Sequence, residues 1–169
     1  GYYSTNCSWS VFIGNSAGMY ARDTTYSIFE GTSAGYNTTS STHAIALGYN
    51  AAKDGYGLGY SLFRGYYAGN LAKSCSQGIF DGWYAGASAS NCSQTVSLGN
   101  NAGRSMSIAT NSICIGANSG YTAKSNSFSV FLGGSSGYAT KNCRYDVFVG
   151  HAAGSSNSDV TNSVAIGAN

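Results

Sequence analysis

The chain has 169 residues with 24 glycines and no proline, and only 8% of its residues are charged. The formal net charge of +2 gives no electrostatic basis for binding nucleic acid or an anionic membrane surface. No apolar stretch approaches the roughly 18 residues of a membrane-spanning helix, so the sequence predicts no membrane insertion. No stretch has the composition of an interdomain linker, and we expect no signal peptide and a single domain covering residues 1–169.

The sequence repeats every 17 residues without a slip. Each repeat carries a short apolar run that ends just before a glycine, and a period this regular indicates one structural unit stacked many times. The runs, in chain order, are residues 10–13, 27–30, 44–47, 61–64, 78–81, 95–98, 112–115, 129–132, 146–149 and 163–166.

The runs alternate with a period of two, which predicts strands. The residue three positions before each glycine is always aliphatic, beginning with Val11, and the residue directly before it usually is, beginning with Ile13. We expect these two columns to face inward, opposite the small residues of the column that begins with Ala17. A 17-residue unit suits two short strands joined by two bends. The predicted fold class is therefore all-β, a β-solenoid of about ten 17-residue coils with parallel, in-register strands.

Three segments resemble repeats of known surface proteins. NSVAIGAN at 162–169 and NSICIGANSG at 111–120 resemble the head repeats of trimeric autotransporter adhesins. VFIGNSAG at 11–18 is similar to repeats of phage tail-fibre and related surface β-roll proteins. The resemblance implies a left-handed β-roll, exposure outside the cell or on its surface, and a homotrimer.

Four of the five cysteines share one column of the repeat: Cys7, Cys75, Cys92 and Cys143. Cys75 and Cys92 are one coil apart, so their Cα atoms should lie about 5 Å apart, within the range of a disulfide. We predict that bond, and with it an oxidising compartment; two free thiols are the alternative. Cys7 and Cys143 are too far apart to meet within one rod, so they are free or are candidates for bonds to other chains.

Three N-x-S/T sequons begin at Asn6, Asn37 and Asn91, on the variable side of the coil. A glycan could be accommodated there. The alternative is chance, because the chain is rich in Asn, Ser and Thr.

The sequence predicts no enzyme, cofactor or metal site. The G-x-S-x-G pattern at 14–18 occurs as part of the repeat, without the strand-to-helix turn and the partner residues that a hydrolase needs. The two histidines, His43 and His151, are more than six coils apart, and no Cys/His cluster has zinc spacing.

Charged and aromatic residues interrupt the repeat in its middle coils. If the column containing Glu30, Arg64 and Asp81 faces inward, these charges are costly, although Arg64 and Asp81 are one coil apart and can pair. Aromatic residues beside Arg are typical of interfaces and of sugar-stacking surfaces. Exposed aromatic ladders that stabilise the stacked coils are the alternative. The candidate patch comprises Tyr49, Arg64, Tyr66, Tyr67, Asp81, Trp83 and Tyr84.

The end repeats resemble the internal ones, and neither carries a capping helix or a charge cluster. A second copy placed after residue 169 would continue the pattern one residue short of the repeat. The sequence therefore predicts a structural subunit of an extracellular fibre, whose partner is another copy of itself stacked head to tail. The alternative is a trimeric adhesin or tail-fibre segment that binds a glycan through the aromatic patch.

Overall fold

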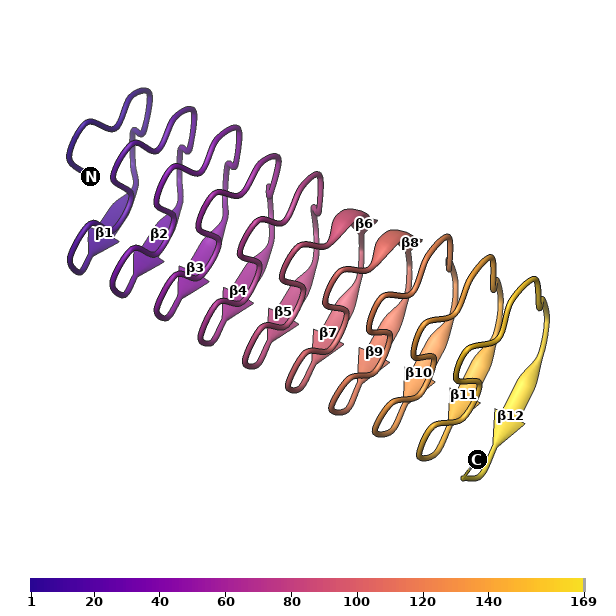
Figure 1. The fold of residues 1–169 in the computed structure, drawn as a ribbon. Coiled ribbons are helices and arrows are strands. Elements are labelled where there is room, and N and C mark those ends of the chain that lie inside the picture. The colour runs from indigo at the N-terminus through magenta and orange to yellow at the C-terminus, as the bar shows by residue number, and fades with distance from the viewer. Residues whose placement is uncertain (169) are drawn as a thin grey trace.

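The computed structural model describes residues 1–168, and they form a β-solenoid. Successive coils lie side by side along one axis, with the N-terminus at one end of the stack and the C-terminus at the other (Figure 1). The described residues contain strands, turns and bends but no helix. The predicted fold class is confirmed.

One ten-stranded parallel sheet runs the whole length of the stack. Each strand pairs with the strand 17 residues later in the same position, as Val11 does with Ile28, so every column of the sequence is a column in space. The strands are β1 (Val11–Ile13), β2 (Ile28–Glu30), β3 (Ile45–Leu47), β4 (Leu62–Arg64), β5 (Ile79–Asp81), β7 (Val96–Leu98), β9 (Ile113–Ile115), β10 (Val130–Leu132), β11 (Val147–Val149) and β12 (Val164–Ile166).

The second strand expected in each coil forms in only two of them. β6 (Ser90–Ser93) pairs with β8 (Ser107–Thr110), and elsewhere this wall consists of turns and isolated bridges such as Thr5↔Arg22. Tyr20, Asp23 and Tyr26 have φ of 60°, 51° and 56°, and later coils repeat this left-handed conformation at the same positions. A left-handed residue at every third position interrupts extended backbone and keeps the pairing on this wall short. β6 and β8 share the conformation at Asn91 and Ile108, and nothing in the structure explains why only these two coils form strands.

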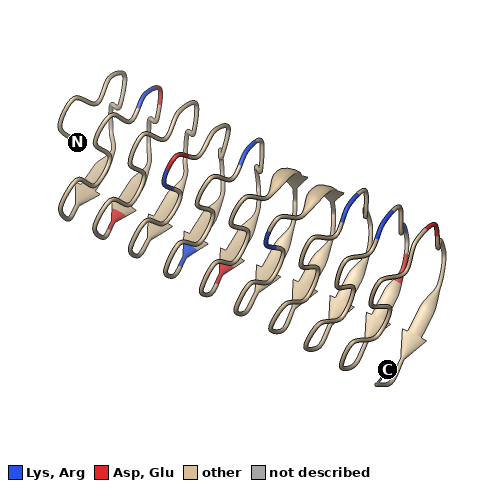
Figure 2. Ribbon diagram, viewed as in Figure 1, with Lys and Arg blue, Asp and Glu red and all other residues tan. Residues whose placement is uncertain are grey.

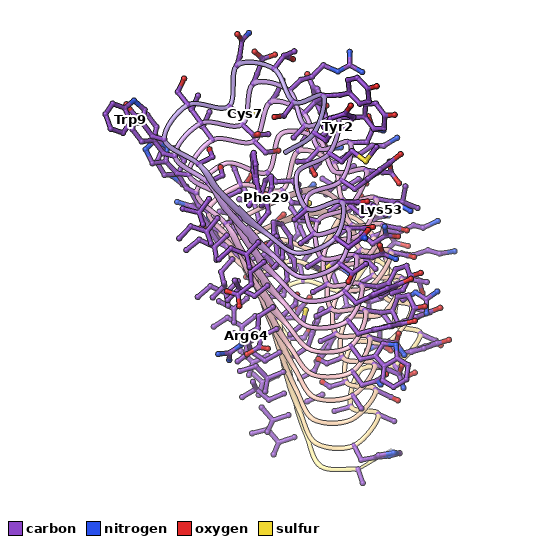
Figure 3. The ribbon with its side chains drawn as sticks, turned by 90° about the vertical axis from the view of Figure 1, so that its left-hand side faces the viewer. Tyr2, Cys7, Trp9, Phe29, Lys53 and Arg64 are labelled. Carbon is purple, nitrogen blue, oxygen red and sulfur yellow. The ribbon has the colours of Figure 1, made fainter. Side chains whose placement is uncertain are left out.

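The strands bury the opposite face from the one that we predicted. The middle residue of each strand points inward, so Phe29 is 0% exposed, whereas the flanking Val11 and Ile28 are 46% and 39% exposed. Seen nearly along the axis, Phe29 lies between the two walls and Arg64 projects outward from the sheet (Figure 3). The prediction that the aliphatic columns line the interior is therefore wrong.

A column of glycines makes room for the inward rings. A Cβ on Gly35 would lie 2.5 Å from Cγ of Phe29, and the equivalent glycines in the other Phe coils are crowded in the same way. The Phe ring reaches across the coil as far as the facing glycine. The interior accommodates the ring only because the facing residue has no side chain.

Three inner coils lack Phe, and each has a larger residue elsewhere in the same cross-section. Ala46 shares its coil with Leu58, Ser97 with Met106, and Cys114 with Asn126, and all six are buried. A Cβ on Gly103 would meet both Ser97 Oγ and Met106 Cε, which shows that these two side chains fill the space of one ring. Each of these coils therefore has a different pair of buried residues in place of the Phe ring.

A column of hydroxyl residues inside the coil links neighbouring coils. Ser27 Oγ donates to the carbonyl oxygens of Thr25 and Ser41, at 3.1 and 3.0 Å, and accepts a hydrogen bond from Ala44 N. Ser61, Ser112 and Ser129 repeat this arrangement. The hydroxyl acts as donor and acceptor at once, which satisfies backbone groups that the turns leave unpaired.

Asp146 occupies this hydroxyl column with a side chain that cannot donate when it is ionised. Its Oδ1 accepts from Ser163 N at 2.8 Å, but its buried Oδ2 has no partner among the described residues. Burial raises the pKa of Asp146, and the Ser163 N–H opposes that rise only in part. A raised folded-state pKa means that the free energy of unfolding falls as pH rises from the ordinary value of 3.8 through the folded-state pKa.

Asp146→Ser should therefore raise the free energy of unfolding at neutral pH by about 1–2 kcal/mol, because it replaces a buried carboxylate that has one unpaired oxygen by a hydroxyl that can both donate and accept. The gain should disappear at pH values below the ordinary pKa of 3.8. Urea unfolding of both proteins across this pH range measures the difference. Asp159→Ser is the control, since Asp159 is exposed and accepts only from Asn142. If the two substitutions changed the free energy of unfolding equally at every pH, the buried carboxylate of Asp146 would not be a source of instability.

Candidate functional site

The outward face of the ten-stranded sheet is apolar and uncovered. We call it the sheet face: the first and third residues of every strand of that sheet. Most of these side chains are aliphatic and are exposed or half-buried, and at the C-terminal end Val164 and Ile166 are 68% and 77% exposed. A continuous apolar surface of this extent is characteristic of a protein interaction site.

Charged residues are sparse on this face. Figure 2 shows them at the ends of β2, β4 and β5, which correspond to Glu30, Arg64 and Asp81. Because the column faces outward, these charges are not buried in the coil. Arg64 and Asp81 form an ion pair, and the hydrogen bond and charge of Asp81 raise the pKa of Arg64. An exposed pair of this kind adds little to stability.

The structure brings the aromatic residues of the candidate patch together just beyond the sheet face. Tyr49 stacks on Tyr66, with ring centroids 5.2 Å apart and an interplanar angle of 11°, and Tyr67 stacks on Tyr84 at 5.0 Å and 19°. Trp83 contacts Tyr66 edge-on at 5.2 Å. Burial, followed by the neighbouring tyrosines, raises the pKa of Tyr66.

Mutual stacking limits what these rings can bind. A sugar stacks on an open ring face, but the stacked faces of Tyr49 and Tyr66, and those of Tyr67 and Tyr84, lie against each other. The arrangement thus favours an aromatic ladder that stabilises consecutive coils. Trp83, which is 54% exposed, is turned by 65° from Tyr66 and is the ring best placed to contact a ligand.

Sequence reasoning missed the extension of this ladder. The Arg104 guanidinium lies 4.7 Å from the ring centroid of Tyr84 and 5.8 Å from that of Tyr121, and Tyr121 stacks on Tyr138 at 5.3 Å. The signal was present in the sequence, because Arg104, Tyr121 and Tyr138 are spaced by one repeat. A cation over a ring face continues the stack between the two groups of tyrosines.

A second aromatic row borders the opposite edge of the sheet face. Tyr26 stacks on His43 at 4.9 Å, His43 stacks on Tyr60 at 4.6 Å, and further along the rod Phe128 stacks on Tyr145 at 5.1 Å. These residues also recur at the repeat spacing. The sheet face is therefore flanked by aromatic rows on both sides.

The predicted disulfide is not formed. All five cysteines in residues 1–168 are free thiols, and Cys75 and Cys92 are both fully buried. Their column points into the coil, and Cβ atoms in adjacent parallel strands lie about 4.8 Å apart, beyond the roughly 3.5–4.5 Å that a disulfide spans. Burial disfavours a thiolate at both positions, while the hydrogen bond between the two thiols raises the pKa of Cys75 and lowers that of Cys92.

The two cysteines proposed for bonds between chains differ in access. Cys143 is 0% exposed and its thiol donates to the Lys141 carbonyl, so it cannot reach another chain while its coil is intact. Cys7 is half-buried and lies 3.0 Å from Thr24 Oγ1. The fifth thiol, Cys114, is packed against Met106, and burial raises its pKa to about 12.

The three sequon asparagines are exposed, as glycan attachment requires. Asn6 donates its amide to Asp23 at 2.8 Å, and Asn37 donates to Asp54 at 2.9 Å, each across one coil. Glycosylation of Asn6, Asn37 or Asn91 remains a prediction.

Comparison with known proteins finds no matching family model and no matching curated sequence. Within residues 1–168 no cluster of three His, Cys, Asp or Glu side chains could hold a metal ion. The same residues include no helix that is long and apolar enough to cross a membrane.

Proposed function

We propose that this chain is a structural subunit of an extracellular fibre in which β-solenoids stack end to end. The observation that carries the proposal is the state of the two end strands. Within the described residues β1 pairs only with β2, and β12 only with β11. At each end of the described residues the outer strand keeps the register of the repeat, so a further coil can pair with its free edge, and edges of this kind bind further strands.

The residues at the two ends also suit stacking in register. Ala165, in β12, occupies the column that Phe fills in most coils. Phe12, in β1, occupies that same column and is half-buried and stacked on Phe29. A following subunit placed in register would set Phe12 beside Ala165.

Val164→Pro tests this stacking. In earlier coils the N–H at this position donates to the following coil, as Val147 N does to the Ser163 carbonyl at 2.9 Å. Val164 occupies the same column, so its N–H points to where a following coil would lie. Proline removes this donor. We expect sedimentation and electron microscopy to show fibres of the unmodified chain and folded, unassembled protein for Val164→Pro.

Val147→Pro is the matched control, because it removes a donor that is used within the chain and should disrupt the fold itself. Fibres that form equally well from Val164→Pro would exclude stacking through β12. An unmodified chain that stays monomeric at high concentration would contradict the proposal as a whole.

A second candidate function is a trimeric adhesin or tail-fibre segment. The apolar sheet face supports lateral packing of several rods, and the exposed indole of Trp83 offers a contact for a glycan. Negative-stain microscopy separates the two candidates, since this one predicts short, discrete trimers and the first predicts long fibres. Val130→Asp, which puts a charge on the sheet face, should dissociate trimers and leave the coil folded.

A further inference from the structure

The solenoid holds tyrosine rings in fixed pairs across neighbouring coils. Because each coil repeats the position of the one before it, these pairs are set by the backbone register and not by chance contacts of mobile side chains. The stacked pairs, with centroid distances and interplanar angles, are Tyr3–Tyr20 (5.4 Å, 5°), Tyr49–Tyr66 (5.2 Å, 11°), Tyr67–Tyr84 (5.0 Å, 19°) and Tyr121–Tyr138 (5.3 Å, 4°).

We propose that the pairs Tyr49–Tyr66 and Tyr67–Tyr84 are sites of oxidative cross-linking, at which a peroxidase acting with hydrogen peroxide joins consecutive coils through dityrosine. This inference is independent of fibre formation, because both bonds lie within one chain. The dityrosine bonds would join consecutive coils covalently at the aromatic patch. The nearby Cys75 and Cys92 are free thiols and form no such bond.

The chemistry balances without a further reagent. Each phenol gives up one electron and one proton, and hydrogen peroxide accepts two of each and becomes two molecules of water. The two phenoxyl radicals combine through their ortho carbons, which forms one C–C bond. The hydrogen on each coupled ortho carbon then moves to the phenoxyl oxygen, which restores both phenols, so the protein loses two hydrogen atoms for each bond.

The two proposed pairs are the near-parallel tyrosine pairs in the patch. The other tyrosine contacts there are tilted or edge-on: Tyr66–Tyr67 at 4.6 Å and 58°, Tyr49–Tyr67 at 5.7 Å and 54°, and Tyr66–Tyr84 at 6.0 Å and 77°. Tyr49 and Tyr66 are 45% and 43% exposed and Tyr67 and Tyr84 are half-buried, so an oxidant can reach both pairs, and stacking holds each ring against its partner. Holding two reactants together replaces an encounter between molecules by a local step. Trp83, which lies 5.2 Å from Tyr66 and 6.4 Å from Tyr84, is a further oxidisable ring in contact with both pairs.

Tyr56 supplies an internal comparison. It is 53% exposed, but its neighbours one coil away are Thr39 and Lys73, so it has no ring to couple with in its column. Tyr26 and Tyr60 are likewise separated by His43. Exposure alone would predict that Tyr56 reacts as readily as Tyr49.

The test is peroxidase and hydrogen peroxide treatment of the purified chain at low concentration, followed by dityrosine fluorescence and tandem mass spectrometry. Trypsin cleaves after Lys53, Arg64 and Lys73. Tyr49 and Tyr56 therefore lie on two separate peptides, and Tyr66 and Tyr67 lie together on a third. We expect monomeric protein that contains Tyr49–Tyr66 and Tyr67–Tyr84 links. The absence of both links, or links through Tyr56 in equal yield, would overturn the proposal.

Tyr84→Phe and Tyr56→Phe form a matched pair of variants. Phe keeps the stacking ring but lacks the phenol, so Tyr84→Phe should abolish the Tyr67–Tyr84 link and leave the Tyr49–Tyr66 link and the circular dichroism spectrum unchanged. Tyr56→Phe should change neither link. An unchanged Tyr67-containing cross-link in Tyr84→Phe would show that the pairing does not follow the stack.

Discussion

Phe131→Ala should lower the free energy of unfolding by about 3–5 kcal/mol, because it removes a buried ring and leaves a cavity. Phe131 is 0% exposed and is stacked at 5.4 Å on Phe148 of the next coil. Nothing beside it is large enough to fill the space, since the facing residue is Gly137. Urea unfolding followed by circular dichroism, with dilute protein, measures the loss.

Val130→Ala is the control in the same strand. Val130 is half-buried on the sheet face, and its truncation should cost less than about 1 kcal/mol in unassembled protein. A larger loss from Val130→Ala than from Phe131→Ala would mean that the aliphatic columns do line the interior, as the period-two alternation first indicated.

Gly82→Ala should destabilise the fold about as much as Phe131→Ala, but through backbone strain and crowding between coils. Gly82 has a φ of 139°, and a Cβ placed on it would lie 2.7 Å from the carbonyl carbon of Gly99 in the next coil. The unfavourable φ and the overpacking each cost about 1–3 kcal/mol. We therefore expect destabilisation by about 3 kcal/mol or more, or failure to fold, in thermal and urea unfolding.

Gly134→Ala is the matched glycine control. Gly134 is outside the left-handed region, and the nearest atom to its added Cβ is His151 Cδ2, at 3.6 Å. The substitution should change the free energy of unfolding by no more than about 0.5 kcal/mol. If Gly82→Ala were as harmless as Gly134→Ala, close approach of the coils would not be the reason for this glycine column.

The repeat predicted the stacking and the register because a column in the sequence must become a column in space when every coil has the same length. The Arg64–Asp81 pair follows directly from that rule. The repeat did not predict which face of each strand is buried, because apolar residues at every second position are compatible with either face pointing inward. The inner column is also irregular, with Ala46, Ser97 and Cys114 in place of Phe, and the residues that compensate lie in other columns of the sequence.

The turn-rich wall could not be predicted from residue types either. Left-handed backbone is usually marked by Gly, Asn or Asp, but here Tyr20 and Tyr26 adopt it as well. Coil-to-coil hydrogen bonds, such as Tyr26 N to the Ser8 carbonyl at 3.1 Å, hold these residues in that conformation. The disulfide prediction rested on the Cα spacing of adjacent coils alone, which does not show where the side chains point, and the structure places Cys75 and Cys92 inside the coil as free thiols.

The most direct test of the fibre proposal is electron microscopy and fibre diffraction of the purified, unmodified chain at high concentration. The proposal predicts long fibres with a meridional spacing of about 4.8 Å from stacked coils. With ten stacked strands in each chain, the axial subunit repeat should be roughly 45–50 Å. Monodisperse monomers that keep the circular dichroism spectrum of the fold, with β1, β12 and the sheet face open to solvent, would contradict it.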